Sequence, residues 1–269
     1  MIARILLPNR NDFSVPNFVQ QLRGLVAQGT VVEAKKVDGK ILVSIGNSAI
    51  QLGISSKPVN WDFQQVMRFS AHWAPDAGQA QAHGAQLMLG ISGSDDRLQQ
   101  AKWLTTAVSA AMQQCPAAIG VHWNAASQFI PATGFRAAAS DPNDWTSIWI
   151  SMACQANAQG SAGCTRGMAA FGQRELETQN ATESVEELYG RLMGLADYLL
   201  QNGPIVKDGE TFGQTSAEKI TVVYANQSSF GNAGPVMNLD YSANQAIPQL
   251  QAQPQPIVAE RVSESAPLQ

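Results

Sequence analysis

Charged residues are scarce in this sequence. Lys, Arg, Asp and Glu make up 14% of the 269 residues, against about 25% in an average soluble domain. The formal net charge is −4, and the longest basic run is the pair Lys35-Lys36. Because a nucleic-acid surface needs clustered cations that contact phosphates, this composition argues against a nucleic-acid partner.

Long apolar runs are also lacking. No stretch approaches the roughly 18 apolar residues that a membrane helix needs, and the apolar run at residues 1–8 is too short for a signal peptide. Cysteine is limited to Cys115, Cys154 and Cys164. Reduced thiols in a cytosolic protein are the simplest interpretation of that odd number, although Cys154 and Cys164 could form a disulfide in an oxidising compartment. We therefore expect a cytoplasmic protein with no membrane contact.

Motifs for catalysis or metal binding are missing as well. The histidines His72, His83 and His122 lie far apart, without the close spacing of zinc ligands. No Gly-x-Ser-x-Gly motif is present, and Cys164 is predicted to lie in a glycine-containing loop, where a thiol is seldom catalytic. The turn at residues 90–96 lacks the lysine of a phosphate-binding loop and carries two aspartates, so it predicts a capped helix start. The sequence predicts no catalytic centre, metal site or cofactor.

The pattern that is present alternates strands with helices. The first unit is predicted to contain a strand at 2–7, a helix that ends near Gly29, and a hairpin whose strands, 31–37 and 40–44, flank the turn Asp38-Gly39. Residues 49–54 extend its sheet. The second unit is a strand at 85–92, a helix between Asp96 and Pro116, and a strand at 117–123, with the spacing of a β-α-β crossover. Residues 57–83 mix aromatic residues with prolines and are predicted to be irregular.

The third unit begins with a predicted strand at 145–153, followed by a Gly- and Ser-rich loop and a strand at 167–177. Ser184 and Glu187 form the pattern of a capping box before the clearest helical stripe in the chain, and a strand is predicted at 219–225.

Together these units predict an α+β fold with mixed sheets and helices packed on one face. Residues 1–243 form a globular domain, with subdomains at 1–82 and 83–243 as an alternative built from repeated strand–helix–strand units. Residues 244–269 are rich in Gln and Pro, lose apolar periodicity, and predict a disordered tail.

The segment Arg174-Glu175-Leu176-Glu177 carries the most suggestive side chains. In a strand, Glu175 and Glu177 point to the same face, about 7 Å apart. Such a pair can be solvated or ion-paired, can contact a protein partner, or can perform acid–base chemistry together with His83 or His122. All three interpretations stay open at this point.

Four segments resemble a known family, and the first two are residues 83–87, which lead a predicted strand, and the helix through residues 103–105. Residues 166–177, which read Arg-Gly-Met-Ala-Ala-Phe-Gly-Gln-Arg-Glu-Leu-Glu, and residues 208–213, which read Asp-Gly-Glu-Thr-Phe-Gly, are similar to the bacterial domain of unknown function four-two-six-one. The similarity extends diffusely over residues 1–241, and the family is similar in outline to Suppressor-of-fused-like domains.

The resemblance implies a binding protein. Domains of that broad type occur among immunity proteins, which neutralise toxins delivered between competing bacteria. We therefore expect a non-enzymatic immunity protein of a type VI secretion effector, whose acidic character complements a basic toxin. The expected partner-binding residues are Glu175, Glu177, Arg174, His83 and Asp208. An effector adaptor or chaperone, and a small-molecule enzyme that uses Glu175 and Glu177, are the alternatives.

Overall fold

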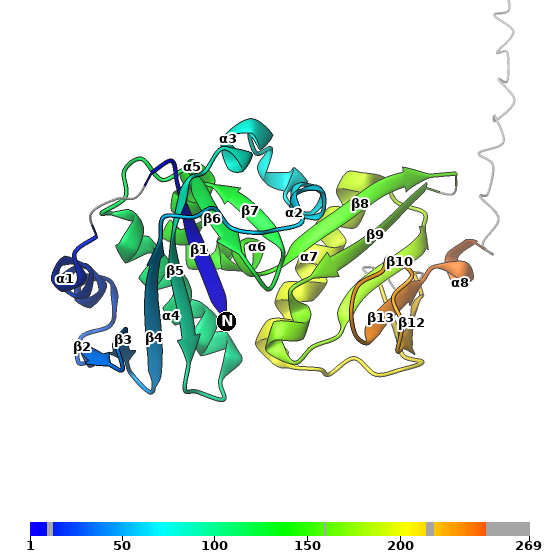
Figure 1. The fold of residues 1–269 in the computed structure, drawn as a ribbon. Coiled ribbons are helices and arrows are strands. Elements are labelled where there is room, and N and C mark those ends of the chain that lie inside the picture. Colours follow the sequence, from blue (N-terminus) through cyan, green and yellow to red (C-terminus); the bar gives the residue numbers. More distant parts are fainter. Residues whose placement is uncertain (10–12, 159, 214–217, 246–269) are drawn as a thin grey trace, which may run out of the picture.

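A computed structural model describes residues 1–9, 13–158, 160–213 and 218–245 (Figure 1). The tail predicted at 244–269 lies outside these ranges from residue 246 onward. No helix in the described ranges is both long enough and apolar enough to cross a membrane.

The first sheet has seven strands in the order β2-β3-β4-β5-β1-β6-β7. Every neighbouring pair in it is antiparallel. Its strands, in chain order, are β1 (Ile2–Leu7), β2 (Val32–Val37), β3 (Lys40–Ile45), β4 (Ser48–Ser55), β5 (Ala85–Ser92), β6 (Gly120–Trp123) and β7 (Gln128–Pro131).

One face of the first sheet is covered by helices α1 (Val15–Leu25), α4 (Arg97–Met112) and α5 (Ala132–Ser140). Strand β1 turns Ala3, Ile5 and Leu7 toward this side, and all three are buried. The predicted unit of a strand, a helix and a hairpin is confirmed, including the turn at Asp38 and Gly39, whose φ values of 48° and 77° suit a tight hairpin.

The predicted β-α-β crossover is also confirmed, with an added strand inside it. Both β5 and β6 pair antiparallel with β1, so they run parallel to each other with β1 between them. Helix α4 connects them and begins at Asp96, whose carboxylate accepts a hydrogen bond of 2.8 Å from the amide of Gln99. The turn at residues 90–96 is therefore a capped helix start, as predicted.

The second sheet has six strands in the order β11-β12-β13-β10-β9-β8. Only β10 and β13 pair in parallel. Its strands are β8 (Ser151–Asn157), β9 (Gly160–Arg166), β10 (Glu175–Ala181), β11 (Thr211–Phe212), β12 (Ile220–Ala225) and β13 (Val236–Asp240). Helix α7 (Val185–Asn202) packs on β8, β9 and β10, and it begins with the predicted capping box of Ser184 and Glu187. The short helix α8 (Ser242–Gln245) follows β13.

Residues 57–83 were predicted to be irregular, and instead they contain short helices. These are α2 (Phe63–Phe69), η1 (Ala71–Trp73) and α3 (Ala77–Gln81), which cover the second face of the first sheet (Figure 1). A small core there joins Leu6 of β1 to Phe129 of β7 and Val66 of α2. Helix α2 also contacts β8 of the second sheet, so this segment lies across the junction of the two sheets.

The main core crosses that junction. A continuous cluster of buried apolar residues runs from Ile5 of the first sheet, through α4, to Leu176 and Val222 of the second. The two sheets confirm the α+β class with mixed sheets, whereas a subdomain boundary at residue 82 stays a prediction.

The third unit departs most from expectation. Residues 145–149, predicted as part of a strand, form helix α6 (Trp145–Trp149), which follows the single turn η2 (Pro142–Asp144). The predicted Gly- and Ser-rich loop is the hairpin of β8 and β9. The predicted strand at 167–177 is mostly the turn η3 (Met168–Phe171), and β10 starts only at Glu175. At residues 145–150 the apolar side chains of Trp145, Ile148, Trp149 and Ile150 form too short a pattern to separate a buried helix from a buried strand.

Candidate functional site

Glu175 anchors the turn η3. Its side chain is 4% exposed and accepts hydrogen bonds from the amides of Gly167 (2.9 Å), Met168 (3.2 Å) and Ala169 (3.1 Å). The hydroxyl of Thr165 donates a fourth bond of 2.9 Å. Three converging amides and one hydroxyl satisfy both oxygens of the carboxylate, which is the arrangement of a structural anion nest.

Glu177 anchors a second segment. It is 1% exposed, and its carboxylate accepts a bond of 2.7 Å from the hydroxyl of Ser228 and one of 3.0 Å from the amide of Ser229. It therefore ties strand β10 to the loop between β12 and β13.

The two glutamates lie on one face of β10, as predicted, but they lie inside the protein. The interpretation of a solvated pair therefore does not hold, and neither carboxylate is presented on the surface for a partner. Their acceptor positions are filled by the chain's own donors, which also disfavours the alternative of an acid–base pair.

Arg174 and Asp208 come together around one tyrosine. The guanidinium of Arg174 stacks on the ring of Tyr224 at 4.1 Å from its centroid, and the carboxylate of Asp208 accepts a bond of 2.7 Å from the Tyr224 amide. Both residues are at least partly accessible, so they remain predicted partner contacts at this corner of the second sheet.

His83 is a structural residue of the segment that covers the first sheet. Its Nε2 accepts a bond of 2.7 Å from the amide of Val59, and its Nδ1 lies 2.7 Å from the carbonyl of Ala80. With one nitrogen accepting and the other donating, the ring is the neutral tautomer with its proton on Nδ1. The side chain is 4% exposed, so His83 is too deeply buried to make the expected contact with a partner.

His122 lies close to His83, with Trp61 packed edge-on against both rings at centroid distances of 5.0 and 5.2 Å. Neither ring nitrogen of His122 has a hydrogen-bond partner in the described part of the chain. Burial, reinforced by the positive charge of Arg4 and by His83, lowers the pKa of His122 to about 4. The ring is neutral and serves as packing.

This lowered pKa predicts an acid-sensitive fold. The folded pKa of His122 lies below its ordinary value near 6.5, so the unfolded chain takes up the proton first and stability falls as the pH drops from 6.5 toward 4. Between pH 7.5 and pH 5 this one group should cost about 2 kcal/mol. Urea unfolding of the native chain and of His122→Phe at both pH values measures it, and an equal pH dependence in the two proteins would contradict the assignment.

The cysteines are not activated thiols. Cys154 and Cys164 sit on paired strands, but Cys164 lies opposite Ala153, so the two thiols project from opposite faces of the sheet. This placement rules out the disulfide considered from the sequence, and the thiols of Cys154 and Cys164 are free. Burial raises the pKa of Cys154 to about 12 and also raises the pKa of Cys164, which keeps both thiols protonated at neutral pH.

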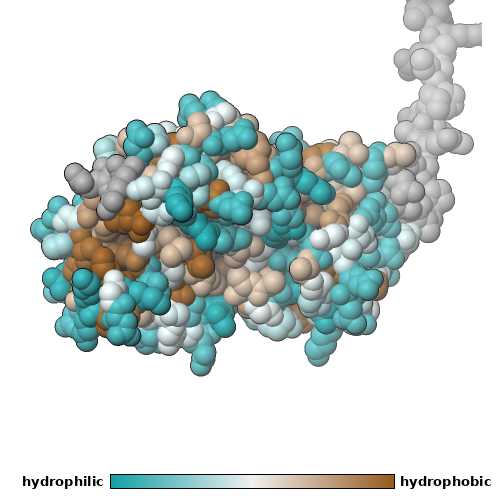
Figure 2. All heavy atoms as spheres, viewed as in Figure 1, coloured by the Kyte–Doolittle hydropathy of each residue, from teal (hydrophilic) through white to brown (hydrophobic). Residues whose placement is uncertain are grey.

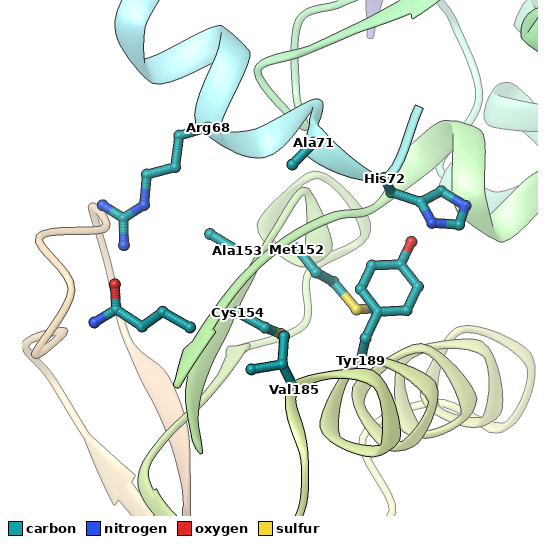
Figure 3. Close-up of a pocket in the computed structure, with 9 residues that line it drawn as sticks. Arg68, Ala71, His72, Met152, Ala153, Cys154, Val185 and Tyr189 are labelled. Atoms are coloured by element: carbon teal, nitrogen blue, oxygen red, sulfur yellow. The ribbon is translucent and has the colours of Figure 1, made fainter. Parts of the chain in front are cut away.

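No group of His, Cys, Asp and Glu side chains in the described ranges could hold a metal ion. A recess lies along the outer edge of β8, between the segment formed by α2 and η1 and helix α7 (Figure 3). This hollow, the β8 groove, has a volume of about 390 Å³. It is lined by Arg68, Ala71, His72, Met152, Ala153, Cys154, Gln155, Val185 and Tyr189.

Three elements build the β8 groove. Four consecutive residues of β8, 152–155, form its floor, and consecutive residues can line one recess only if it follows the strand's edge. The end of α2 and η1 form one wall, and the first turns of α7 form the other. Figure 3 shows Arg68 and the pair of His72 and Tyr189 at opposite ends of the groove, with β8 between them.

The side chains at the two ends differ in chemistry. The rings of His72 and Tyr189 stack at a centroid distance of 4.7 Å and an angle of 18°. Burial lowers the pKa of His72 and raises the pKa of Tyr189, so both rings are neutral at pH 7. At the other end Arg68 is exposed and forms no ion pair or hydrogen bond within the described residues. The groove is therefore aromatic and uncharged at one end and cationic at the other.

The residues of the β8 groove were not among the sites predicted from the sequence. Arg68 and His72 lie in the segment predicted to be irregular, and β8 was predicted only in part. One signal was available: the sequence of β8, Ser-Met-Ala-Cys-Gln-Ala-Asn, carries no charge and no proline.

The second sheet is also where the chain matches a family. Residues 164–240, from β9 to the end of β13, match the family described as Domain of unknown function (DUF4261). No curated protein and no solved structure matches the chain. The matched range contains Glu175, Glu177, Arg174 and Asp208, together with Tyr189 of the groove. The resemblance expected from the motifs at 166–177 and 208–213 is thus confirmed for residues 164–240, where the chain is similar to this uncharacterised family.

Proposed function

We propose that this chain is a non-enzymatic protein-binding protein that acts as an immunity protein and neutralises a toxin effector of a type VI secretion system. The observation that carries the binding role is the β8 groove, which combines an unpaired strand edge, stacked rings and an unpaired cation. These are the features that a polypeptide can engage, through backbone hydrogen bonds, apolar contact and charge.

The side chains that could perform chemistry are engaged elsewhere. The buried carboxylates of Glu175 and Glu177 accept hydrogen bonds from internal donors, and His83 bonds to the backbone of Val59 and Ala80. The thiols of Cys154 and Cys164 are protonated at neutral pH. A binding role uses none of these groups, which is why it fits better than an enzyme built on the glutamate pair.

Charge supports a toxin as the partner. The net charge of −4 attracts a basic protein over long range and speeds the encounter. A toxin that degrades nucleic acid is an example of such a basic protein, because it must bind phosphates. The neutralising role itself rests on the family resemblance at residues 164–240 and on that family's likeness in outline to Suppressor-of-fused-like domains, a broad type that occurs among immunity proteins.

Affinity purification of the tagged chain from its native host, followed by mass spectrometry, tests the proposal. We expect one stoichiometric partner with a toxin domain, and we expect co-expression of the chain to restore growth to cells that make this toxin. A partner from the secretion apparatus would replace the immunity role with that of an adaptor. Purification of the chain alone from cells that express the toxin would contradict the binding role.

A further inference from the structure

The fold has four strand edges, and three of them are protected. Strand β2 carries Lys35 and Lys36 along its exposed length. Strand β7 has only four residues and ends in Pro131, and β11 has two residues. Charge, proline and shortness are the features by which natural edge strands avoid pairing with other chains.

Strand β8 has none of these protections. It is seven residues long, and its sequence is neutral and free of proline. Among the described residues, the backbone of residues 152–156 makes no hydrogen bond with any segment other than β9. Every second residue of an edge strand turns its N–H and C=O outward, so β8 offers unpaired donors and acceptors along the floor of the β8 groove.

We infer that the β8 groove binds an extended segment of the partner protein, which adds to the second sheet as a strand beside β8 and places an acidic side chain against Arg68. This inference rests on the proposed binding function and names its surface and mode. An added strand lies about 4.8 Å from β8, in the space between the wall formed by α2 and η1 and the wall formed by α7.

The walls set the side-chain pattern of the segment. Ala153 faces the side of α2, where it packs with Phe69. Cys154 and its cross-strand partner Gly163 face the side of α7, since a Cβ atom on Gly163 would lie 3.2 Å from Leu188 of that helix. Side chains of an added strand alternate between these two sides in the same way.

The two sides select different side chains. On the side of α2, the guanidinium of Arg68 is unpaired, and its contact is the ring of Phe69 at 5.7 Å from the centroid. Arg166, whose guanidinium lies 4.4 Å from the same ring centroid, adds positive charge. On the side of α7, Val185 and Tyr189 offer apolar surface. The segment that fits therefore alternates acidic and apolar residues. The protein that carries this segment can still be basic overall, because its net charge acts on the chain at long range whereas Arg68 acts on the segment in direct contact.

A displayed library of linear peptides of about ten residues, selected on the full chain, tests this inference. We expect enriched peptides to alternate acidic and apolar residues. Gln155→Glu, which places a negative charge on the side that the segment's acidic residue faces, and Arg68→Glu should each weaken the binding of a synthesised enriched peptide by about tenfold or more. Arg68→Gln should cause a smaller loss. Lys35→Glu, the same charge reversal on the edge of β2, should leave the affinity unchanged.

Amide hydrogen exchange separates strand addition from contact by side chains alone. A bound peptide that pairs with β8 should slow exchange at residues 152–156 by about tenfold or more, whereas side-chain contact would leave these amides as they are. Enriched peptides whose binding is unchanged by both Gln155→Glu and Arg68→Glu, or a library that yields no binder, would overturn the inference.

Other occupants give different results. Binding that appears only after residues 246–269 are removed would mean that the chain's own end occupies the groove. A dimer that Gln155→Glu converts to a monomer would mean that a second copy of the chain occupies the groove. Either outcome would contradict the inference that the groove binds a segment of a partner protein. If a toxin co-purifies and is neutralised equally by the Gln155→Glu chain, the proposed function stands and this inference fails. If peptides bind at β8 but no toxin partner exists, this inference stands and the proposed immunity function fails.

Discussion

Glu175→Gln is expected to lower the free energy of unfolding by about 3 kcal/mol. The carboxylate accepts hydrogen bonds from the amides of Gly167, Met168 and Ala169 and from the hydroxyl of Thr165. A glutamine offers one acceptor oxygen, and its NH₂ group would face donors where the second carboxylate oxygen now lies. At least one buried amide would lose its partner, and the negative charge that strengthens the others would be gone.

Urea unfolding at pH 7, read by tryptophan fluorescence and circular dichroism, measures the effect as a shift in midpoint at constant slope. Glu33→Gln is the matched control, because the Glu33 side chain on β2 is 57% exposed and its nearest cation, Lys35, is 4.0 Å away. That substitution should change stability by less than about 0.5 kcal/mol. A loss at Glu175 no larger than the loss at Glu33 would mean that the nest does not hold the turn η3.

The glutamate pair also shows where sequence reasoning stops. Alternation along 175–177 correctly placed both side chains on one face, because that follows from the period of a strand. Their burial could not be derived in the same way. It depends on Ser228 and Ser229, about fifty residues further along the chain, and on a turn at 167–169 whose amides converge on one point.

Local signals predicted the helices that have their own caps. Ser184 with Glu187, and Asp96, mark the starts of α7 and α4 because a capping side chain bonds to an amide within the next turn. Strand β9, by contrast, reads Gly-Ser-Ala-Gly-Cys-Thr-Arg, and its composition favours a loop. It is a strand because β8 and β10 lie on either side of it, which is a tertiary effect. The β8 groove depends on the same strand order, so it too was beyond the reach of the sequence alone.

Gly120→Ala is expected to lower the free energy of unfolding by about 3 kcal/mol. Gly120 begins β6, and a Cβ atom there would lie 2.3 Å from the carbonyl oxygen of Ile130 and 2.5 Å from the ring of Phe129. Phe129 is 1% exposed and belongs to the small core that holds α2 over the first sheet. The ring cannot move aside freely because Leu6 and Val66 pack in the same cluster, and the carbonyl belongs to the neighbouring strand β7.

Gly90→Ala separates this clash from the general effect of adding a methyl group to a strand glycine. Gly90 lies in β5 of the same sheet, and the nearest atom to its Cβ would be Cγ1 of Ile2 at 3.8 Å, an ordinary contact. Neither glycine has a positive φ, so the two substitutions differ in available space alone. Gly90→Ala should be neutral or stabilise the fold by about 0.5 kcal/mol, since it reduces the freedom of the unfolded chain.

The Gly120→Ala substitution should also affect the β8 groove, because helix α2 contacts both Phe129 and the groove. Because Phe129 supports Val66 and the same helix carries Arg68, a displaced ring in Gly120→Ala should shift the wall of the groove as well as weaken the core. Tryptophan fluorescence of Trp61, which packs edge-on against Phe129 at a centroid distance of 6.2 Å, should change in the folded state of Gly120→Ala and stay unchanged in Gly90→Ala. Equal stability of the two variants would mean that β6 and β7 separate at little cost, and that α2 is held by the second sheet rather than by Phe129.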